Sequence, residues 1–248
     1  MAGHSKWANI KHRKGAQDKK RGKIFTKLIK EITVAAKIGS PDPDSNPRLR
    51  LAIQNAKGVN MPKDNIERAI KKATGADGTE YTEVTYEGYA PNGVAVFVEC
   101  TTDNLNRTVS SVRSTFSKYG GNLATNGSVE FLFNRKGIFQ ITRPEGIDED
   151  EFELELADGG AEEVEFSEEY IIVTCEMEDF GNVQKKLDEM EIEAESAGLE
   201  RIPTTSVALS NDDLQQSMKV IDKLEDDDDV QKVYHNIEIS EDQMQLLG

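Results

Sequence analysis

Three stretches within the first 75 residues repeat apolar side chains every three or four positions, which places them on one face of a helix. The spacing predicts helices over residues 18–38, 47–57 and 62–74. Asn46 precedes the second helix as a suitable N-cap, and Pro47 fits its first position. Because each helix is short and amphipathic, we expect the three to pack together as a small bundle.

Beyond residue 80 the pattern alternates between strands and helices. Strands 84–90 and 93–102 are expected to pair through the turn 91–93, and helix 105–119 and strand 128–133 follow. The next segment predicts strand 137–143, helix 148–157, strands 161–166 and 169–176, helix 180–190 and strand 193–202. This βαββαβ order is the ferredoxin-like arrangement. The end of the chain predicts strand 204–209, helix 212–224 and strand 230–237.

These elements indicate a multi-domain α+β protein, with an N-terminal three-helix domain followed by two α+β domains, at least one of them ferredoxin-like. The 84–133 segment forms only one half of an α+β domain, and the last strand–helix–strand segment supplies the other half. We therefore predict three domains: a basic arm and helix bundle over 1–78, a discontinuous domain from 79–134 plus 204–248, and an inserted ferredoxin-like domain over 135–203. Three consecutive domains are the alternative. A chain of 248 residues has room for two or three domains.

Charge separates the chain into two parts. Residues 1–75 hold 18 Lys and Arg against 6 Asp and Glu, a net charge of +12. Residues 76–248 hold 12 against 40, a net charge of -28, and together they give the overall -16. Such a split is typical of a polyanion-binding end on an acidic body. The alternative is that both sets of charges are simply solvated surface.

The first 30 residues contain ten Lys and Arg side chains and a single acidic residue, Asp18. This density favours nucleic acid as the partner, because Lys and Arg neutralise phosphates. Trp7 is the only tryptophan, and it either stacks on a base or packs on the following helix. The predicted nucleic-acid-binding residues are Lys6, Trp7, Lys11, His12, Arg13, Lys14, Lys19, Lys20, Arg21, Lys23, Lys27, Lys30, Lys63, Arg68, Lys71 and Lys72.

Catalytic and cofactor chemistry is not indicated by any motif. The sequence contains no GxGxxG, P-loop, HExxH or GxSxG pattern, so we expect no enzyme activity, no cofactor and no metal. Cys100 and Cys175 lack metal or redox spacing and are expected to be buried free thiols. Asp103, Asn104, Asn106 and Arg107 form a polar cluster after a strand. A helix N-terminus there could receive an anion, but capping explains Asp103 and Asn104 more simply. The acidic stretch Asp226–Asp229 could bind a cation weakly, but it is expected to be a solvent-exposed loop.

The opening MAGHSKWANIKHRKGAQDKKRGKIFTKLIKEI resembles the start of the YebC family. These are the "probable transcriptional regulatory" proteins, which are related to mitochondrial translational activators of cytochrome oxidase. Further similar segments are NPRLRLAIQNAKGVNMPKDNIERAIKKATG, YEGYAPNGVAVFVECTTDNLNRT and VRSTFSKYGGNLATNGSVEFLF. The resemblance implies a three-domain fold, association with nucleic acid or the ribosome, and no known catalytic residues.

Two functions follow from these observations. The first is a non-enzymatic, DNA-binding transcriptional regulator in the cytoplasm. The second is a ribosome-associated translation factor that binds rRNA or tRNA, since structured RNA is read by shape and backbone. The acidic body is expected to engage a basic protein surface, or to fold back on the basic helices and compete with nucleic acid. A membrane-surface role for the 18–38 helix is a third alternative, and we predict no membrane partner.

Overall fold

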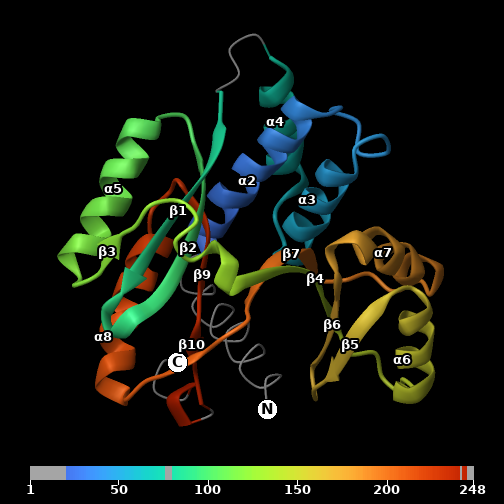
Figure 1. Cartoon of the computed structure of the whole chain (residues 1–248). Coiled ribbons are helices and arrows are strands. Elements are labelled where there is room, and N and C mark those ends of the chain that lie inside the picture. The colour runs from blue at the N-terminus through green and yellow to red at the C-terminus, as the bar shows by residue number, and fades with distance from the viewer. Residues whose placement is uncertain (1–20, 76–79, 241, 245–248) are drawn as a thin grey trace. The chain divides into compact units, whose positions relative to one another are not determined.

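The computed structural model of the chain describes residues 21–75, 80–240 and 242–244 (Figure 1). The chain divides into two compact units. Unit 1 comprises the described parts of Met1–Val34, Gly75–Asn134 and Ile202–Gly248, and unit 2 comprises Ala35–Thr74 and Arg135–Arg201. Each unit is therefore assembled from segments that are distant in sequence. The division into three domains stays a prediction.

Unit 1 is built on a four-stranded sheet in the order β3-β1-β2-β9. Two helices pack on it, and a second, two-stranded sheet pairs β10 with β8. The elements are α2 (Arg21–Ile38, as far as Val34), β1 (Thr82–Ala90), η1 (Pro91–Gly93), β2 (Val94–Thr102), α5 (Leu105–Lys118), β3 (Asn122–Leu123), η2 (Glu130–Leu132), the start of β4 (Phe133–Thr142), β8 (Val207–Ala208), α8 (Asn211–Glu225), β9 (Val230–His235) and β10 (Ile237–Glu238).

Strand β2 is the centre of unit 1 because both of its faces are buried. Successive side chains of a strand point to opposite sides. Val96 and Val98 face one way, toward a core that includes Val112 of α5 and Ile221 of α8. Phe97 faces the other way, into a second cluster with Val129, Phe133 and Tyr234. Apolar residues follow one another without alternation in β2 because each face of the strand is buried in a different core.

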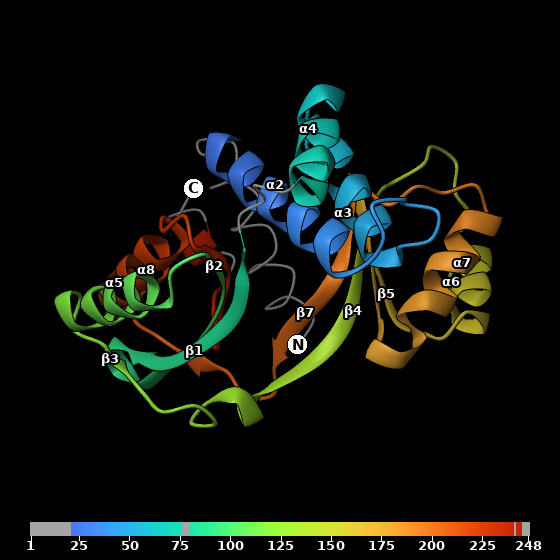
Figure 2. The same cartoon turned by 90° about the horizontal axis from the view of Figure 1, so that it is seen from above.

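The strand predicted over 128–133 is wrong. Residues Glu130–Leu132 form a short 3-10 turn, and β4 begins only at Phe133. The reason lies in β1, where the buried carboxylate of Glu87 accepts hydrogen bonds from the backbone N–H groups of residues 127, 129 and 130. Because these donors bind a side chain, they cannot take part in a ladder with a neighbouring strand. Figure 2 shows this turn between β3 and β4.

Unit 2 contains a four-stranded sheet in the order β5-β6-β4-β7, together with helices α6 and α7. This strand order and the βαββαβ sequence of elements confirm the predicted ferredoxin-like arrangement. The elements are the end of α2, α3 (Pro47–Gly58), α4 (Lys63–Thr74), the rest of β4, α6 (Glu149–Asp158), β5 (Ala161–Phe166), β6 (Tyr170–Glu176), η3 (Met177–Asp179), α7 (Phe180–Glu189) and β7 (Ser196–Pro203).

Helix α3 is attached to the region of β7 by polar contacts. The side chain of Asn55 donates to the carbonyl of Ala197 at 2.8 Å and accepts from the N–H of Ala197 at 2.9 Å. Gln54 donates to the carbonyl of Ala194 at 3.0 Å. The predicted cap is confirmed, since Asn46 accepts from the N–H of Leu49 at 3.1 Å. Contacts thus join α3 to the ferredoxin-like sheet within unit 2.

Candidate nucleic-acid interface

The basic residues predicted to bind nucleic acid fall into three groups. One group lies outside the described residues: Lys6, Trp7, Lys11, His12, Arg13, Lys14, Lys19 and Lys20. The second group lies in the part of α2 that belongs to unit 1 and comprises Arg21, Lys23, Lys27 and Lys30. The third group lies on α4 in unit 2 and comprises Lys63, Arg68, Lys71 and Lys72.

The lysines of α2 are not the free positive face that the sequence pattern predicts. Three of them, Lys23, Lys27 and Lys30, contact the C-terminal end of α8 and the acidic residues after it. Lys23 Nζ donates to the carbonyl of Asp226 at 2.7 Å and lies 3.2 Å from its Oδ1. Lys27 Nζ donates to the carbonyl of Glu225 at 3.1 Å. Part of the acidic body therefore folds back on this helix, the alternative that we considered from the charge pattern.

Lys30 makes the most deeply buried of these contacts. Its Nζ lies 3.0 Å from Oδ1 of Asp229 and 2.6 Å from the carbonyl of Asp228. Only 11% of the Lys30 side chain and 7% of the Asp229 side chain is exposed. The expectation of a solvent-exposed loop is therefore wrong for Asp229, because its carboxylate is needed in the interior as a partner for Lys30.

Asp229 also binds α5. Nε and Nη2 of Arg107 donate to its Oδ2 at 3.0 and 2.7 Å, and Thr108 Oγ1 donates to the same oxygen at 2.9 Å. Burial raises the pKa of Asp229, but the hydrogen bonds from Arg107, Lys30 and Thr108 outweigh this and leave the pKa below its ordinary value. The hydrogen bond to Asp229 also raises the pKa of Arg107, since it stabilises the charged guanidinium. The carboxylate is thus held ionised.

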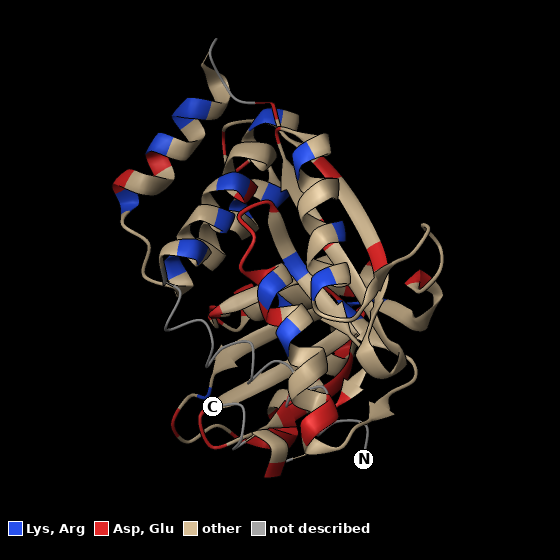
Figure 3. Ribbon diagram, turned by 90° about the vertical axis from the view of Figure 1, so that its left-hand side faces the viewer, with Lys and Arg blue, Asp and Glu red and all other residues tan. Residues whose placement is uncertain are grey.

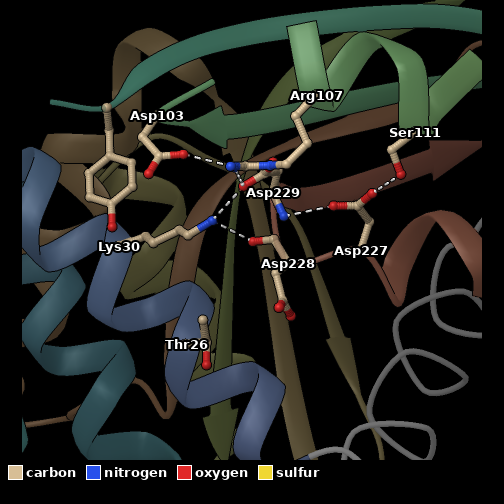
Figure 4. A pocket seen from close by; sticks show the side chains of 9 residues that line it. Thr26, Lys30, Asp103, Arg107, Ser111, Asp227, Asp228 and Asp229 are labelled. Carbon is tan, nitrogen blue, oxygen red and sulfur yellow. Dashed lines mark hydrogen bonds and ion pairs between the residues drawn. The ribbon is translucent and has the colours of Figure 1, made fainter. Parts of the chain in front are cut away.

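An open pocket of about 430 Å³ surrounds this network (Figure 4). It is lined by Thr26, Lys30, Tyr81, Asp103, Arg107, Ser111, Asp227, Asp228 and Asp229. Arg107 donates to Asp103 at 2.8 Å, and Ser111 donates to Asp227. Asn104 accepts from the N–H of Arg107 at 3.0 Å, which confirms the cap explanation for Asn104. Asp103 instead pairs with Arg107. Because these polar groups satisfy one another, the arrangement holds α2 to the sheet.

The basic side chains of α4 are exposed. Figure 3 shows Lys and Arg positions in blue along the ribbon of α4, at the upper left of the view. Nζ of Lys63 lies 3.5 Å from Oε1 of Glu67, and such an exposed ion pair contributes little to stability. Arg68 donates to Asn65 and to the carbonyl of Asp64. Lys71 and Lys72 lie in the last turn, where a positive charge interacts favourably with the negative end of the helix dipole. This helix presents accessible positive charge.

One histidine and both cysteines are buried. His235 is buried, and its Nδ1 accepts from the N–H of Ile237 at 3.3 Å. Cys100 and Cys175 are free and buried, as predicted, and burial raises their pKa values to about 12 and about 11. Within the described ranges no group of His, Cys, Asp and Glu is arranged to hold a metal ion. None of the helices in the described part of the chain is long and apolar enough to cross a membrane.

Comparisons with known proteins agree over nearly the whole chain. Residues 5–76 match a family model described as the TACO1/YebC protein N-terminal domain. Residues 81–237 match one described as the TACO1/YebC second and third domain. A protein of Amoebophilus asiaticus named "Probable transcriptional regulatory protein" is 58% identical over 239 residues, which is 96% of this chain and 98% of that one. A protein of the same name from Geotalea uraniireducens is 54% identical over the full length of both.

A solved structure is also similar. The crystal structure of a conserved hypothetical protein from Aquifex aeolicus matches with a TM-score of 0.79 and 45% sequence identity. The match covers 89% of this chain and 91% of that chain.

Proposed function

The chain belongs to the TACO1/YebC family, and from that membership we propose that it is a non-enzymatic regulatory protein that binds nucleic acid, acting as a DNA-binding transcriptional regulator. Relatives named as transcriptional regulatory proteins support the regulatory part of this proposal. The observation that carries the binding part is the charge division, +12 in residues 1–75 against -28 in the remainder.

The two described groups of basic residues take different parts in this proposal. The four cations of α4 are exposed and available to phosphates. Lys30 is buried in its pair with Asp229, so it holds α2 in place and does not reach a ligand. Lys23 and Lys27 are intermediate in accessibility, because their contacts with Asp226 and Glu225 are only partly buried. Nucleic acid therefore competes with the acidic loop for Lys23 and Lys27.

A specific observation supports the alternative of an RNA-bound translation factor. Direct reading of DNA sequence relies on side chains such as Arg that make two hydrogen bonds to a base edge. On α4 the exposed cations are mostly lysines, and Arg68 is engaged with its own helix. Lysines bind phosphates as point charges, which suits recognition of a structured RNA by its backbone.

The binding test uses the full chain and a variant in which Lys63, Arg68, Lys71 and Lys72 are all changed to Gln. The matched control changes four exposed cations elsewhere, Arg113, Lys118, Lys185 and Lys219, to Gln. Affinity for a duplex DNA and for a structured RNA is measured between 50 and 200 mM salt. We expect the α4 variant to bind more weakly with a shallower salt dependence, and the control to behave like the parent protein.

The choice between the two nucleic acids is tested separately. Native lysate is sedimented through a sucrose gradient at low and high salt. Migration with ribosomes at low salt and release at high salt support the translation alternative, whereas enrichment at defined promoters supports the transcriptional regulator. A purified chain that binds neither DNA nor RNA at 50 mM salt would overturn the proposal.

A further inference from the structure

A buried carboxylate holds the turn that precedes β4. Glu87 is 2% exposed, and its two oxygens accept from the N–H groups of Gly127 and Val129 at 2.6 Å and of Glu130 at 3.0 Å. Among the described residues no Lys, Arg or His forms an ion pair with Glu87. Burial of a charge is costly unless hydrogen bonds compensate it, and here the backbone of the turn supplies them. The turn is therefore strongly tied to β1.

Further contacts hold the same turn on other sides. Tyr89 donates its hydroxyl to the carbonyl of Ser128 at 3.1 Å, and Thr204 donates its N–H to the carbonyl of Leu132 at 2.8 Å. Val129 and Phe133 are buried in the cluster behind β2, where the ring centroids of Phe133 and Phe97 are 6.3 Å apart. Both ends of the turn are thus anchored in the core of unit 1.

Phe131 lies in the middle of this rigid turn and is 71% exposed. It is the only aromatic residue among the large apolar side chains that the described residues leave exposed. An aromatic ring held outward on a fixed backbone loses little conformational entropy when it binds a partner. The turn therefore presents the ring in a fixed position for recognition.

The surroundings of the ring suggest the chemistry of the partner. A protein-binding anchor usually lies within an apolar patch. The exposed residues that precede Phe131 in this segment are instead polar or small, namely Thr125, Asn126, Gly127 and Glu130. A single exposed ring in an otherwise polar segment suits an unpaired base, which stacks on the ring by its face. We propose that Phe131 is a stacking platform for an unpaired nucleobase. This inference rests on the proposed nucleic-acid binding and specifies single-stranded segments as its ligand.

Stacking and phosphate binding leave different signatures. Stacking carries no net charge, so loss of the ring lowers affinity without changing the salt dependence. Loss of a phosphate-binding lysine lowers affinity and also makes the salt dependence shallower. A duplex offers few unstacked bases, so it does not report on the ring.

The test measures binding of the full chain to a 20-nucleotide single-stranded RNA and to the corresponding duplex at several salt concentrations. In Phe131→Ala we expect affinity for the single strand to fall by roughly tenfold, with the same salt slope and unchanged affinity for the duplex. Phe131→Trp keeps a ring and is expected to retain affinity. The matched control is Leu154→Ala, since Leu154 on α6 is an exposed apolar residue of similar exposure, 67%. It should bind like the parent protein.

Because Phe131 is exposed, its substitution should leave the denaturation midpoint unchanged, which is checked by urea unfolding. Equal single-strand affinity of Phe131→Ala and the parent protein would overturn the inference while leaving nucleic-acid binding intact. So would an equal loss on single strand and duplex. If Phe131→Ala instead lost binding to a protein partner and kept its affinity for RNA, the ring would be a protein contact and the inference would be overturned. Failure of the parent protein to bind the single-stranded RNA would also overturn the inference, whereas the proposed function is judged separately by the assays on duplex DNA and structured RNA.

Discussion

Lys30 and Asp229 are 199 positions apart in the chain, and their side chains form an ion pair at 3.0 Å that is largely closed to water. The pair joins α2 to the segment between α8 and β9. Arg107 approaches the same carboxylate from α5, so one side chain connects three parts of unit 1. This relationship explains why part of the basic helix is structural.

Removal of the Asp229 charge should destabilise the protein strongly. In Asp229→Asn, Lys30 keeps its charge in a buried position without a carboxylate, and we expect the free energy of unfolding to fall by about 3 kcal/mol. Urea denaturation measures the change. Asp228→Asn is the matched control, because it removes the same charge from the exposed neighbouring residue, and it should be nearly neutral. Equal stability of the two variants would show that the buried pair contributes nothing.

The contribution of Asp229 should depend on pH. Its pKa in the folded protein lies below the ordinary 3.8, because its hydrogen bonds outweigh the effect of burial. The unfolded chain therefore binds the proton first as the pH falls, and acid favours unfolding. The stability difference between the parent protein and Asp229→Asn should be constant above about pH 5 and shrink below about pH 4. Denaturation curves from pH 7 to pH 3 test this, and a difference that grew toward acid would contradict it.

Weakening the contact between Lys23 and Asp226 should favour nucleic acid. The Lys23 side chain is 41% exposed and that of Asp226 is 27% exposed, so their pair contributes at most about 1 kcal/mol. Asp226→Asn should therefore strengthen RNA binding by roughly two- to fivefold at low salt. Asp228→Asn changes the net charge equally without removing a side-chain contact to Lys23. A similar gain in both variants would attribute the effect to net charge alone.

Gly58 is required where α3 approaches residue 195. A Cβ atom at this position would lie 2.0 Å from the carbonyl oxygen of Glu195, a backbone atom that cannot swing away. We expect Gly58→Ala to lower the free energy of unfolding by roughly 1–3 kcal/mol. Gly181→Ala is the control, because Gly181 lies in α7 with no atom within 4 Å of the added methyl group. It should raise stability by up to about 1 kcal/mol, as alanine favours helix.

Most elements were predictable because their signals are local. The apolar spacing of α3 and its Asn46 cap lie within a dozen residues, and the structure confirms both. The βαββαβ order of unit 2 followed from successive local patterns in the same way. Caps, turns and periodicity are properties of neighbouring residues, so a single sequence contains them.

The errors arise where distant residues meet. The 128–133 segment has the composition of a strand, but Glu87, some forty residues earlier, takes its N–H groups. Lys23 and Lys30 follow the pattern of an exposed basic face, but their carboxylate partners come about two hundred residues later. No spacing rule connects such pairs. The buried role of Asp229 had no signal within its acidic surroundings.

The discontinuous construction of unit 1 has a consequence for synthesis. Strand β9 pairs with β2, Val233 opposite Val98, and it follows Asp229 directly. A ribosome adding 5–20 residues per second needs roughly 10–40 s to pass from Lys30 to Asp229. Throughout that interval the nascent helix α2 carries its lysines without the carboxylates that later neutralise them. Each new copy of the protein is therefore at its most cationic while still attached to the machinery that makes it.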